Sequence, residues 1–343
     1  MRLRKSRSPK GTGKIKGATG SSGSRITGVG GYRPERVIPN SEIVDAIDSS
    51  DEWIRERSGI TERRFARPDE SVVDMAEAAS KGAIAMAGID QSDLDAVLVA
   101  TVTHPYQTPA AAPMLADRFD LRCAAFDISA ACAGYCHGIS LASDMVRGGS
   151  ASNVLVVGVE KLSDFTDMTD RSTAFIFGDG AGAAIVSRSD KTKIGPTVWG
   201  SEGDSWQTIM QRESWTEFRG NDEKTWPTIG MEGHKVFRWA VWGMAPVAQK
   251  AMEAAGVKAS DLDAFIPHQA NMRIIDAMIK QLKLPEDIVV ARDIATTANT
   301  SAASIPLATE RMLREGQVQS GSLALQIGFG AGLVYAAQVV ELP

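Results

Sequence analysis

Cysteine is scarce in this chain, which has only Cys123, Cys132 and Cys136 among 343 residues. So small and odd a number cannot build a disulfide framework, and it indicates a reducing compartment. The sequence also lacks any apolar run near the roughly 18 residues that a membrane span needs, and no secretory signal follows the start. We therefore expect a cytoplasmic protein that does not insert into a membrane.

Acidic residues are missing from one segment, residues 1–24, which has seven Lys or Arg and many Gly and Ser. Such a segment buries too little apolar surface to order itself, so we expect a disordered basic tail; a nucleic-acid-binding arm and a transit peptide are alternatives. The formal net charge is −5, and eight cations lie within residues 1–25, so residues 26–343 carry −13. This acidic body argues against nucleic acid as a partner.

Patterns for metals and redox cofactors are missing as well. Cys132-Ala-Gly-Tyr-Cys136-His137 has three residues between its cysteines where haem attachment has two, and zinc would lack a second ligand pair. Gly178-x-Gly180-x-Gly182 is not the Gly-x-Gly-x-x-Gly of dinucleotide-binding dehydrogenases. We expect neither a metal nor a redox cofactor.

What the sequence does contain is an internal repeat. Ser-Ala-Ala-Cys at 129–132 recurs as Ser-Ala-Ala-Ser at 301–304, and residues 87–96 are matched at 255–264, offsets of 172 and 168. The glycine-rich residues 178–182 are echoed at 328–332. Three matches in the same order predict a duplicated α/β unit with halves at 25–190 and 191–343.

Helix and strand signals alternate in both halves. Ser71 is typical of a helix N-cap and Gly88 of a helix end, which predicts a helix over 72–87. By periodicity we expect further helices at 132–147, 232–255, 271–282 and 304–315, and buried strands at 94–101, 124–128, 153–159, 262–266, 323–327 and 333–340. This order favours two mostly parallel sheets covered by helices.

Cys132 is the first candidate nucleophile, because only one copy of the repeated turn carries a thiol. It begins a predicted helix, where unpaired N–H groups and the helix dipole favour a thiolate. A cysteine among Ala and Gly can also be a small core residue. A nucleophile needs partners, and His268 ends a predicted strand, while Asn299 precedes the second copy of the turn. His104 holds the matching place in the first half and could be structural.

These motifs resemble the β-ketoacyl-[acyl-carrier-protein] synthase III family of the thiolase fold. The resemblance covers about residues 26–341, in the family's order. It is carried by Cys132 in Ser-Ala-Ala-Cys-Ala-Gly-Tyr, His268 in Pro-His-Gln-Ala-Asn, Asn299 in Asn-Thr-Ser-Ala-Ala-Ser, and by the segments 50–54, 57–60, 169–171 and 177–182. It implies two repeated halves in a layered α/β/α/β/α sandwich.

The resemblance implies the initiating condensation of fatty-acid synthesis. Cys132 would take the acyl group of an acyl-CoA primer, and His268 and Asn299 would stabilise the enolate formed when malonyl-acyl-carrier-protein loses CO2. The product would be a 3-oxoacyl-acyl-carrier-protein. The backbone N–H groups of Cys132 and Ala331 would form the oxyanion hole.

Further residues carry over from the family. Trp53, Arg57, Arg171 and Asn271 would bind CoA, the indole by stacking on adenine and the guanidiniums through phosphates. Three positions depart from the family's usual residues, namely Ala298 and Ala331 in place of glycine and His234 in place of a pantetheine-contacting asparagine.

Two expectations concern macromolecular partners. Arg273, Lys280, Lys235 and Arg238 form a basic cluster on two helices, which could receive an acidic carrier protein or be an ordinary solvated face. The family also implies a homodimer in which Thr108 caps the partner's acyl pocket. Short-chain enzymes carry phenylalanine there, so the smaller threonine predicts acceptance of longer or branched primers.

Other classes remain open on the residues alone. A papain-like hydrolase uses Cys, His and Asn in this order. However, the sequence signature of that class is absent here, and an internal repeat has no place in it. A decayed, non-catalytic scaffold would not need all three side chains. Within the fold, 3-hydroxy-3-methylglutaryl-CoA synthases and chalcone-type synthases are closer rivals, which dependence on a carrier protein would separate.

Overall fold

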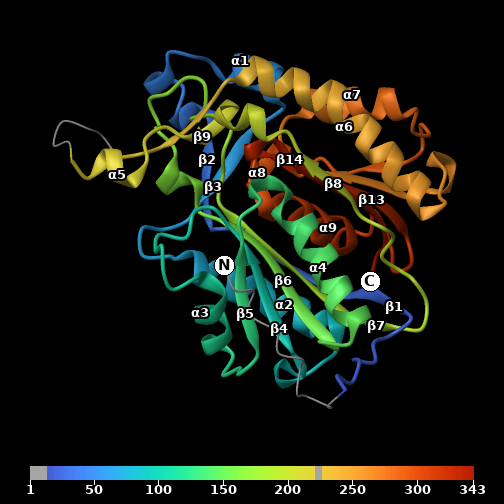
Figure 1. Cartoon of the computed structure of the whole chain (residues 1–343). Helices are drawn as coiled ribbons and strands as arrows, with labels where there is room; N and C mark the ends of the chain where they lie inside the picture. The colour runs from blue at the N-terminus through green and yellow to red at the C-terminus, as the bar shows by residue number, and fades with distance from the viewer. Residues whose placement is uncertain (1–13, 221–225) are drawn as a thin grey trace, which may run out of the picture.

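The computed structural model describes residues 14–220 and 226–343, and shows two five-stranded sheets with helices between and outside them (Figure 1). The first sheet has the order β1-β7-β6-β4-β5. Its strands are β1 (Gly23–Tyr32), β4 (Ala96–Ala100), β5 (Ala124–Ile128), β6 (Asn153–Glu160) and β7 (Gly180–Ser189). Residues 1–13 of the expected tail lie outside the described part, and β1 already begins at Gly23.

The second sheet repeats the arrangement of the first, in the order β12-β11-β13-β14-β8. Its strands are β8 (Val198–Ser201), β11 (Ala264–Pro267), β12 (Val289–Val290), β13 (Leu323–Gly330) and β14 (Val334–Glu341). The strands of the two sheets fall on either side of residue 190, from which we infer the boundary between the halves.

In each sheet two neighbouring pairings are parallel and two are antiparallel. Four of the five strands in each sheet therefore run in the same direction, as the prediction of mostly parallel sheets requires, and only β7 and β14 are reversed. Strands buried on both faces read as continuous apolar runs whatever their direction, so the hydrophobic pattern could not tell β7 and β14 from parallel strands.

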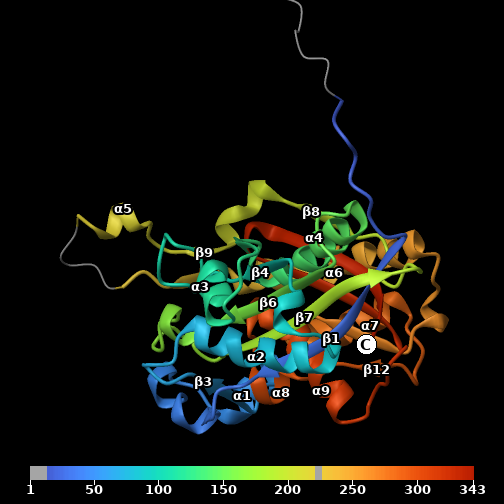
Figure 2. The same ribbon diagram turned by 90° about the horizontal axis from the view of Figure 1, so that it is seen from below.

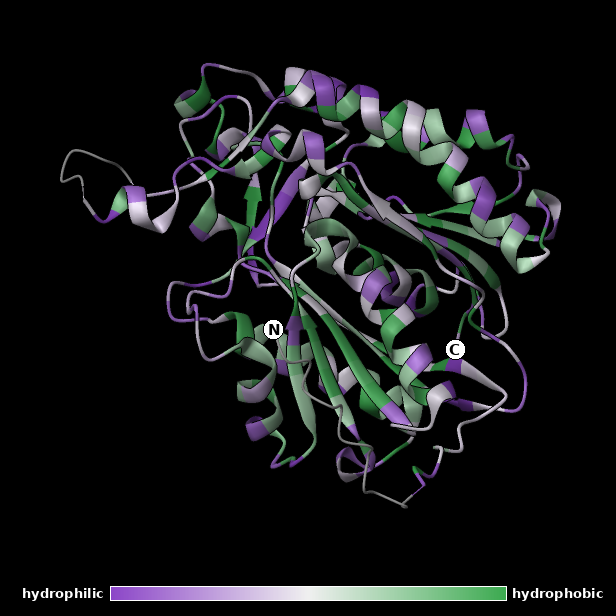
Figure 3. Cartoon of the chain, in the orientation of Figure 1, coloured by the Kyte–Doolittle hydropathy of each residue, from purple (hydrophilic) through white to green (hydrophobic). Residues whose placement is uncertain are grey.

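Helices form three layers around the sheets, which confirms the layered α/β/α/β/α sandwich. Helices α2 (Val72–Ala87) and α3 (Ala111–Arg118) cover the outer face of the first sheet, with α2 across β1 and β7 (Figure 2). Helices α4 (Gly134–Gly148) and α9 (Ser304–Arg314) lie between the sheets, and α6 (Gly233–Ala255) and α7 (Met272–Leu282) cover the second sheet. The strands of the first sheet are strongly apolar, whereas α6 alternates polar and apolar residues (Figure 3).

The helix ends follow the local signals in the sequence. Ser71 and Asp74 form a reciprocal capping box at the start of α2, and Gly88 ends the helix in the left-handed region at φ 65°. The remaining described elements are short: α1 (Asp51–Ser58), α5 (Trp215–Phe218), α8 (Ile294–Thr297), and the strand pairs β2 (Arg36–Pro39) with β3 (Glu62–Phe65) and β9 (Ile209–Gln211) with β10 (Ile229–Met231). Within the described ranges, no helix is both long enough and apolar enough to cross a bilayer.

The true register of the repeat differs from one of the sequence matches. The 3-10 turn η4 (Ala131–Ala133) leads into α4 as the turn η8 (Ser301–Ala303) leads into α9, so Cys132 corresponds to Ala302 and not to Ser304. Ala131 and Ser301 share a positive φ, 43° and 48°. The structural offset is thus 170, and the Ser-Ala-Ala match at 172 is out of register by two residues.

Two glycines allow each turn to rest on the sheet of the other half. A Cβ on Gly158 of β6 would lie 2.2 Å from the carbonyl oxygen of Ala302, and one on Gly328 of β13 would lie 3.0 Å from that of Cys132. Both distances are shorter than van der Waals contact, so the backbones can approach this closely only where a side chain is missing. The two glycines hold the two turns together at the centre of the molecule.

We predict that Gly158→Ala lowers the free energy of unfolding by at least about 2 kcal/mol, because the new methyl group must displace the Ala302 backbone. Gly148→Ala is the matched control: no atom lies within 4 Å of its added Cβ at the end of α4, and we expect a gain of about 0.5 kcal/mol. Urea denaturation of both variants measures the difference. Equal stability of the two variants would contradict the packing argument.

Candidate active site

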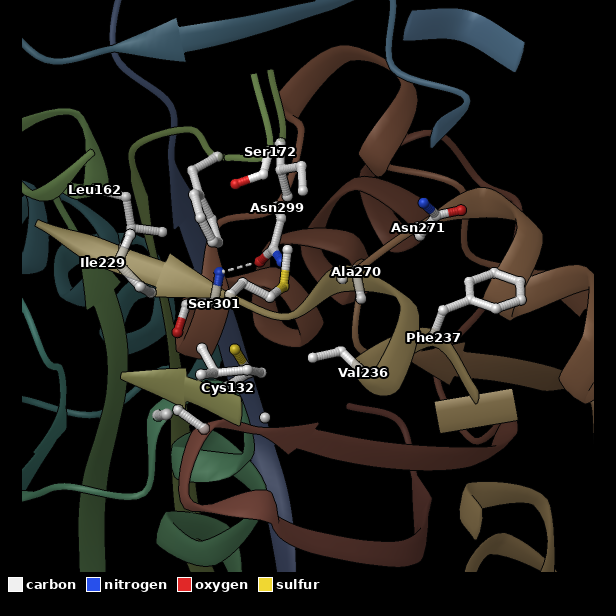
Figure 4. A pocket seen from close by; sticks show the side chains of 18 of the residues that line it. Cys132, Leu162, Ser172, Ile229, Val236, Phe237, Ala270, Asn271, Asn299 and Ser301 are labelled. Atoms are coloured by element: carbon white, nitrogen blue, oxygen red, sulfur yellow. Dashed lines mark hydrogen bonds between the residues drawn. The ribbon is translucent and has the colours of Figure 1, made fainter. Parts of the chain in front are cut away.

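A pocket of about 630 Å³ lies where the two halves meet, and Cys132, His268 and Asn299 all line it. Cys132 belongs to η4, His268 directly follows β11, and Asn299 directly precedes Thr300 at the start of η8. Figure 4 shows Asn299 and Ser301 on the same side of the pocket as Cys132. The structure therefore brings together the three residues that the sequence predicted as a constellation.

The Cys132 thiol is surrounded by protein on most sides. A Cβ on Gly330 would lie 2.8 Å from its Sγ, so glycine at this position of β13 leaves the space that the thiol occupies. Burial raises the pKa of the thiol to about 12, and a hydrogen bond from Ser301 only partly offsets this. The resting thiol is neutral, contrary to the thiolate expected from the helix start, because removal from water outweighs the effect of the helix.

His268 is buried, and burial lowers the pKa of its imidazole to about 3. The ring is therefore neutral at physiological pH. Its Nδ1 lies 2.7 Å from Ser304 Oγ, which accepts the backbone N–H of Gln269 at 3.3 Å. With that lone pair engaged, the Ser304 hydroxyl can donate to Nδ1, which places the ring proton on Nε2. His268 then presents an N–H donor to the pocket.

Asn299 is held by its backbone and by its side chain. Its N–H donates to the Ile176 carbonyl at 2.9 Å, and its own carbonyl accepts the Gly178 N–H at 3.0 Å. The side-chain Oδ1 accepts the Ser301 N–H at 2.8 Å, so the amide NH2 is the end available to a ligand (Figure 4). The preceding Ala298 adopts φ 56°, ψ −159°, a conformation that favours glycine.

Two backbone N–H groups lie at the starts of 3-10 turns beside the thiol. Cys132 is the second residue of η4, and Ala331 is the first residue of η9 (Ala331–Leu333), which follows β13. First-turn N–H groups have no acceptor within their own helix, so they are suited to receive an oxyanion. Ala331 itself has no positive φ; the left-handed conformation falls on Gly332 at φ 82°.

The predicted CoA residues line the same pocket and lie beside one another. The guanidiniums of Arg57 and Arg171 lie 5.7 and 5.0 Å from the centre of the Trp53 ring. Asn271 also lines the pocket, but its side chain already caps α7 through Arg273 N–H and donates to the Arg57 carbonyl at 2.9 Å. It therefore joins α7 to the end of α1, on which Arg57 lies. His234, at the family's asparagine position, lines the pocket too.

The four basic residues of the predicted docking cluster, Arg273, Lys280, Lys235 and Arg238, are all exposed. Arg273 stacks 5.0 Å above the Phe237 ring, which connects the starts of α7 and α6, and it also borders the pocket. Lys235 is paired with Glu232 at 2.6 Å. Arg273 thus places one member of the cluster at the pocket.

Thr108 and His104 lie away from this pocket. Thr108 is exposed and is not among the lining residues of its own chain. His104 Nε2 is 3.2 Å from the Pro109 carbonyl, a contact within the loop after β4.

The sequence analysis missed two polar residues beside the thiol. Ser301 lines the pocket with Cys132 and interacts with its thiol, and its Oγ donates to Glu160, whose carboxyl is buried at the end of β6. An acidic residue that closes the apolar run Val-Leu-Val-Val-Gly-Val-Glu was the available signal for Glu160. The apolar wall of the pocket was missed as well; it includes Leu162, Phe177, Ile209 and Ile229.

Comparison with known proteins is consistent across sequence and structure. A family model described as 3-oxoacyl-[acyl-carrier-protein (ACP)] synthase III matches residues 126–203, and the model of the C-terminal part of the same enzyme matches residues 252–342. A beta-ketoacyl-[acyl-carrier-protein] synthase III of Streptomyces glaucescens is 60% identical over 331 residues, covering 96% of this chain and 99% of that protein. A mycobacterial beta-ketoacyl-[acyl-carrier-protein] synthase III of Mycobacterium marinum is 52% identical with the same coverage.

Solved structures agree with this assignment. The priming beta-ketosynthase of a polyketide biosynthetic pathway superposes with a TM-score of 0.93 at 45% identity, covering 96% of this chain and 98% of that one. The 3-oxoacyl-(acyl carrier protein) synthase III of Pseudomonas aeruginosa gives 0.87 at 36% identity, covering 94% and 98%. On these matches, which span nearly the whole chain, the protein belongs to the 3-oxoacyl-[acyl-carrier-protein] synthase III family of the thiolase fold.

Proposed function

We propose that this chain condenses an acyl-CoA primer with malonyl-acyl-carrier-protein to give a 3-oxoacyl-acyl-carrier-protein, through an acyl-Cys132 intermediate. The observation that carries the proposal is the convergence of Cys132, His268 and Asn299 on one pocket that Trp53 and two arginines also line. A thiol, two N–H donors and a site for a nucleotide are the parts that transfer from a CoA thioester needs.

In the first half-reaction, Cys132 sulfur attacks the thioester carbonyl and CoA leaves. The carbonyl oxygen becomes negative as the carbon turns tetrahedral, and the N–H groups of Cys132 and Ala331 are placed to stabilise it. Arg57 and Arg171 would bind the phosphates of CoA beside the Trp53 ring.

In the second half-reaction, malonyl-acyl-carrier-protein loses CO2 and its carbon attacks the acyl-cysteine. The enolate oxygen needs hydrogen-bond donors, and the His268 Nε2–H and the Asn299 NH2 supply them. A neutral imidazole suits this role because it donates without adding a charge that a buried site would have to solvate. Side chains and backbone amides carry every proposed step, so the proposal includes no metal, flavin or nicotinamide.

The test is to incubate the protein with radiolabelled acyl-CoA, digest it, and locate the label. We expect label on the Cys132 peptide, stable in water and discharged by malonyl-acyl-carrier-protein, and none in Cys132→Ala. His268→Ala and Asn299→Ala should still take up label but lose condensation by at least about 100-fold, since each removes one enolate donor. Label that water alone discharges would instead indicate a cysteine hydrolase.

We further propose that the basic cluster of Arg273, Lys280, Lys235 and Arg238 receives the acidic carrier protein. The contact of Arg273 with the pocket supports this, because the carrier's phosphopantetheine arm has to reach Cys132.

Arg273→Glu should reduce turnover of malonyl-acyl-carrier-protein at least about tenfold at low salt while leaving acylation by acyl-CoA within about twofold, because it reverses a docking charge. Lys258→Glu, three residues beyond the C-terminal end of α6, is the matched control. Steady-state kinetics at two ionic strengths measure both. Equal losses in the two half-reactions would reject the docking role.

A homodimer is part of the proposal. Strand β5 is an edge of the first sheet, and Phe126 on it is exposed, as are Val102 and Tyr106 in the loop after the neighbouring β4. An uncovered edge with apolar side chains is a typical pairing surface. Pairing there would bring Thr108, in the same loop, close to the partner chain.

The short side chain of Thr108 leads us to propose longer or branched acyl primers. Dodecanoyl-CoA should acylate the protein at least as fast as acetyl-CoA in a single turnover. Thr108→Phe should slow dodecanoyl-CoA at least about tenfold by filling the end of the partner's acyl pocket, with acetyl-CoA unaffected. A strong acetyl preference in the unmodified protein would refute this. Priming of a polyketide is a second candidate function, favoured by the 0.93 TM-score to a priming ketosynthase, and primer choice separates the two.

A further inference from the structure

Glu160 is a fully buried carboxyl that the proposed condensation does not use. It ends β6, directly beneath the two turns. Its Oε2 accepts three hydrogen bonds from the segment after β4: from Thr101 Oγ1 at 3.2 Å, from Val102 N at 3.1 Å and from Thr103 Oγ1 at 2.7 Å. Its Oε1 accepts only Ser301 Oγ, at 3.0 Å, among the described residues.

The donors on Oε2 come from one short segment. Thr101 Oγ1 accepts the Thr103 N–H, and Thr103 Oγ1 accepts the Lys161 N–H, which leaves both hydroxyl hydrogens available to Glu160. The two hydroxyls are 3.4 Å from each other, farther than either is from Oε2. An oxygen that already accepts three donors has no room for a proton. A proton arriving at Glu160 must therefore go to Oε1, the oxygen that faces Ser301.

Ser301 connects this oxygen to the nucleophile. Its hydroxyl donates to Glu160 Oε1 at 3.0 Å and interacts with the Cys132 thiol, which lines the same pocket. Its backbone N–H is separately committed to Asn299. Its φ of 48° is rare for a residue with a side chain and places the hydroxyl between the two groups. At the matching place of the first turn, φ 43° falls on an alanine, which has no such group.

We propose that Glu160 is the base of the first half-reaction. It acts on the Cys132 thiol through the Ser301 hydroxyl, which makes Glu160 a positioning residue. The inference rests on the proposed acyl-Cys132 intermediate and deepens it.

The proton moves in two coupled transfers. The S–H bond of Cys132 breaks as its proton passes to Ser301 Oγ, while the Ser301 O–H proton passes to Glu160 Oε1. The electron pair left on sulfur attacks the thioester carbonyl, the carbon–sulfur bond to CoA breaks, and the CoA thiolate takes a proton from water. In the second half-reaction the attacking carbanion expels Cys132 as a thiolate, which recovers the stored proton from Glu160 along the same path.

The surroundings of the carboxyl fit a base that works near neutral pH. Burial raises the pKa of Glu160 to about 7, and its four hydrogen bonds act in the opposite direction. Other titratable groups nearby point elsewhere: Lys161 Nζ bonds the Arg67 carbonyl and Asp164, and Asp179 bonds Ser163 and the Ala66 N–H. Cys132 is the titratable group that Glu160 reaches through a single hydroxyl.

The experiment measures single-turnover acylation of the full chain by acyl-CoA between pH 6 and 9.5, without carrier protein. The unmodified protein should accelerate up to about pH 7 to 8 and then level off, as Glu160 loses its proton. In Glu160→Gln the thiol must ionise directly, and its own pKa is near 12. We expect acylation at least about 100-fold slower at pH 7.5, rising about tenfold per pH unit with no plateau.

Alkylation of Cys132 by iodoacetamide gives a readout that needs no CoA binding and should show the same change of pH profile. Ser301→Ala interrupts the path without altering Glu160 or the backbone bond to Asn299, and it keeps the test open if Glu160→Gln fails to fold. Asp179→Asn, which alters a buried carboxyl that bonds Ser163 instead of Ser301, should retain the plateau.

The two proposals can fail separately. Acyl uptake that persists in Cys132→Ala would overturn the proposed function itself. Acyl uptake that depends on Cys132 but keeps its rate and its plateau in Glu160→Gln and Ser301→Ala would overturn the base role and leave the condensation intact.

Discussion

The contact between two short turns, one from each half, is the constraint on which the site depends. Each turn rests on a glycine of the opposite sheet, Gly328 under η4 and Gly158 under η8. Cys132 lies in one turn, and Asn299 is bonded to the first residue of the other. The distance between nucleophile and carboxamide is thus set by packing at the centre of the molecule. Loops at the surface would hold it less firmly, because their stability is lower.

Burial at this contact keeps the reactive groups uncharged at rest. It raises the pKa of the Cys132 thiol and lowers that of His268, so a neutral thiol faces a neutral imidazole. Charge then appears only as the reaction proceeds, on the thioester oxygen and later on the enolate. Hydrogen-bond donors that are already in position stabilise such charges without reorganising, whereas water would have to reorient. A pocket with little water therefore stabilises the transition state more effectively.

Many of these features could be predicted from the sequence because they depend on residues that are close together in the chain. The capping signals of α2 and the alternation of strands and helices were predicted correctly, and Cys132, His268 and Asn299 line one pocket. The reversed direction of β7 was not predicted, since an apolar run has no polarity in its sequence. The register of the repeated turn was predicted incorrectly for a different reason. The two turns correspond through the backbone conformation of Ala131 and Ser301, and the residue types at these positions differ.

The neighbourhood of the thiol also depends on contacts that no local pattern contains. Glu160 and Ser301 are separated by 141 positions and meet only because the halves fold against each other. The thiol's pKa likewise follows from the depth of the site, which the residues flanking Cys132 do not reveal.

The central expectation is an acyl group on Cys132 whose carbonyl lies between the N–H groups of η4 and η9. A crystal structure of the protein after reaction with an acyl-CoA tests this most directly. It should show the acyl group on Cys132 Sγ, with its oxygen about 2.7–3.1 Å from the backbone nitrogens of Cys132 and Ala331. An unmodified thiol, or an acyl oxygen directed away from both nitrogens, would contradict it.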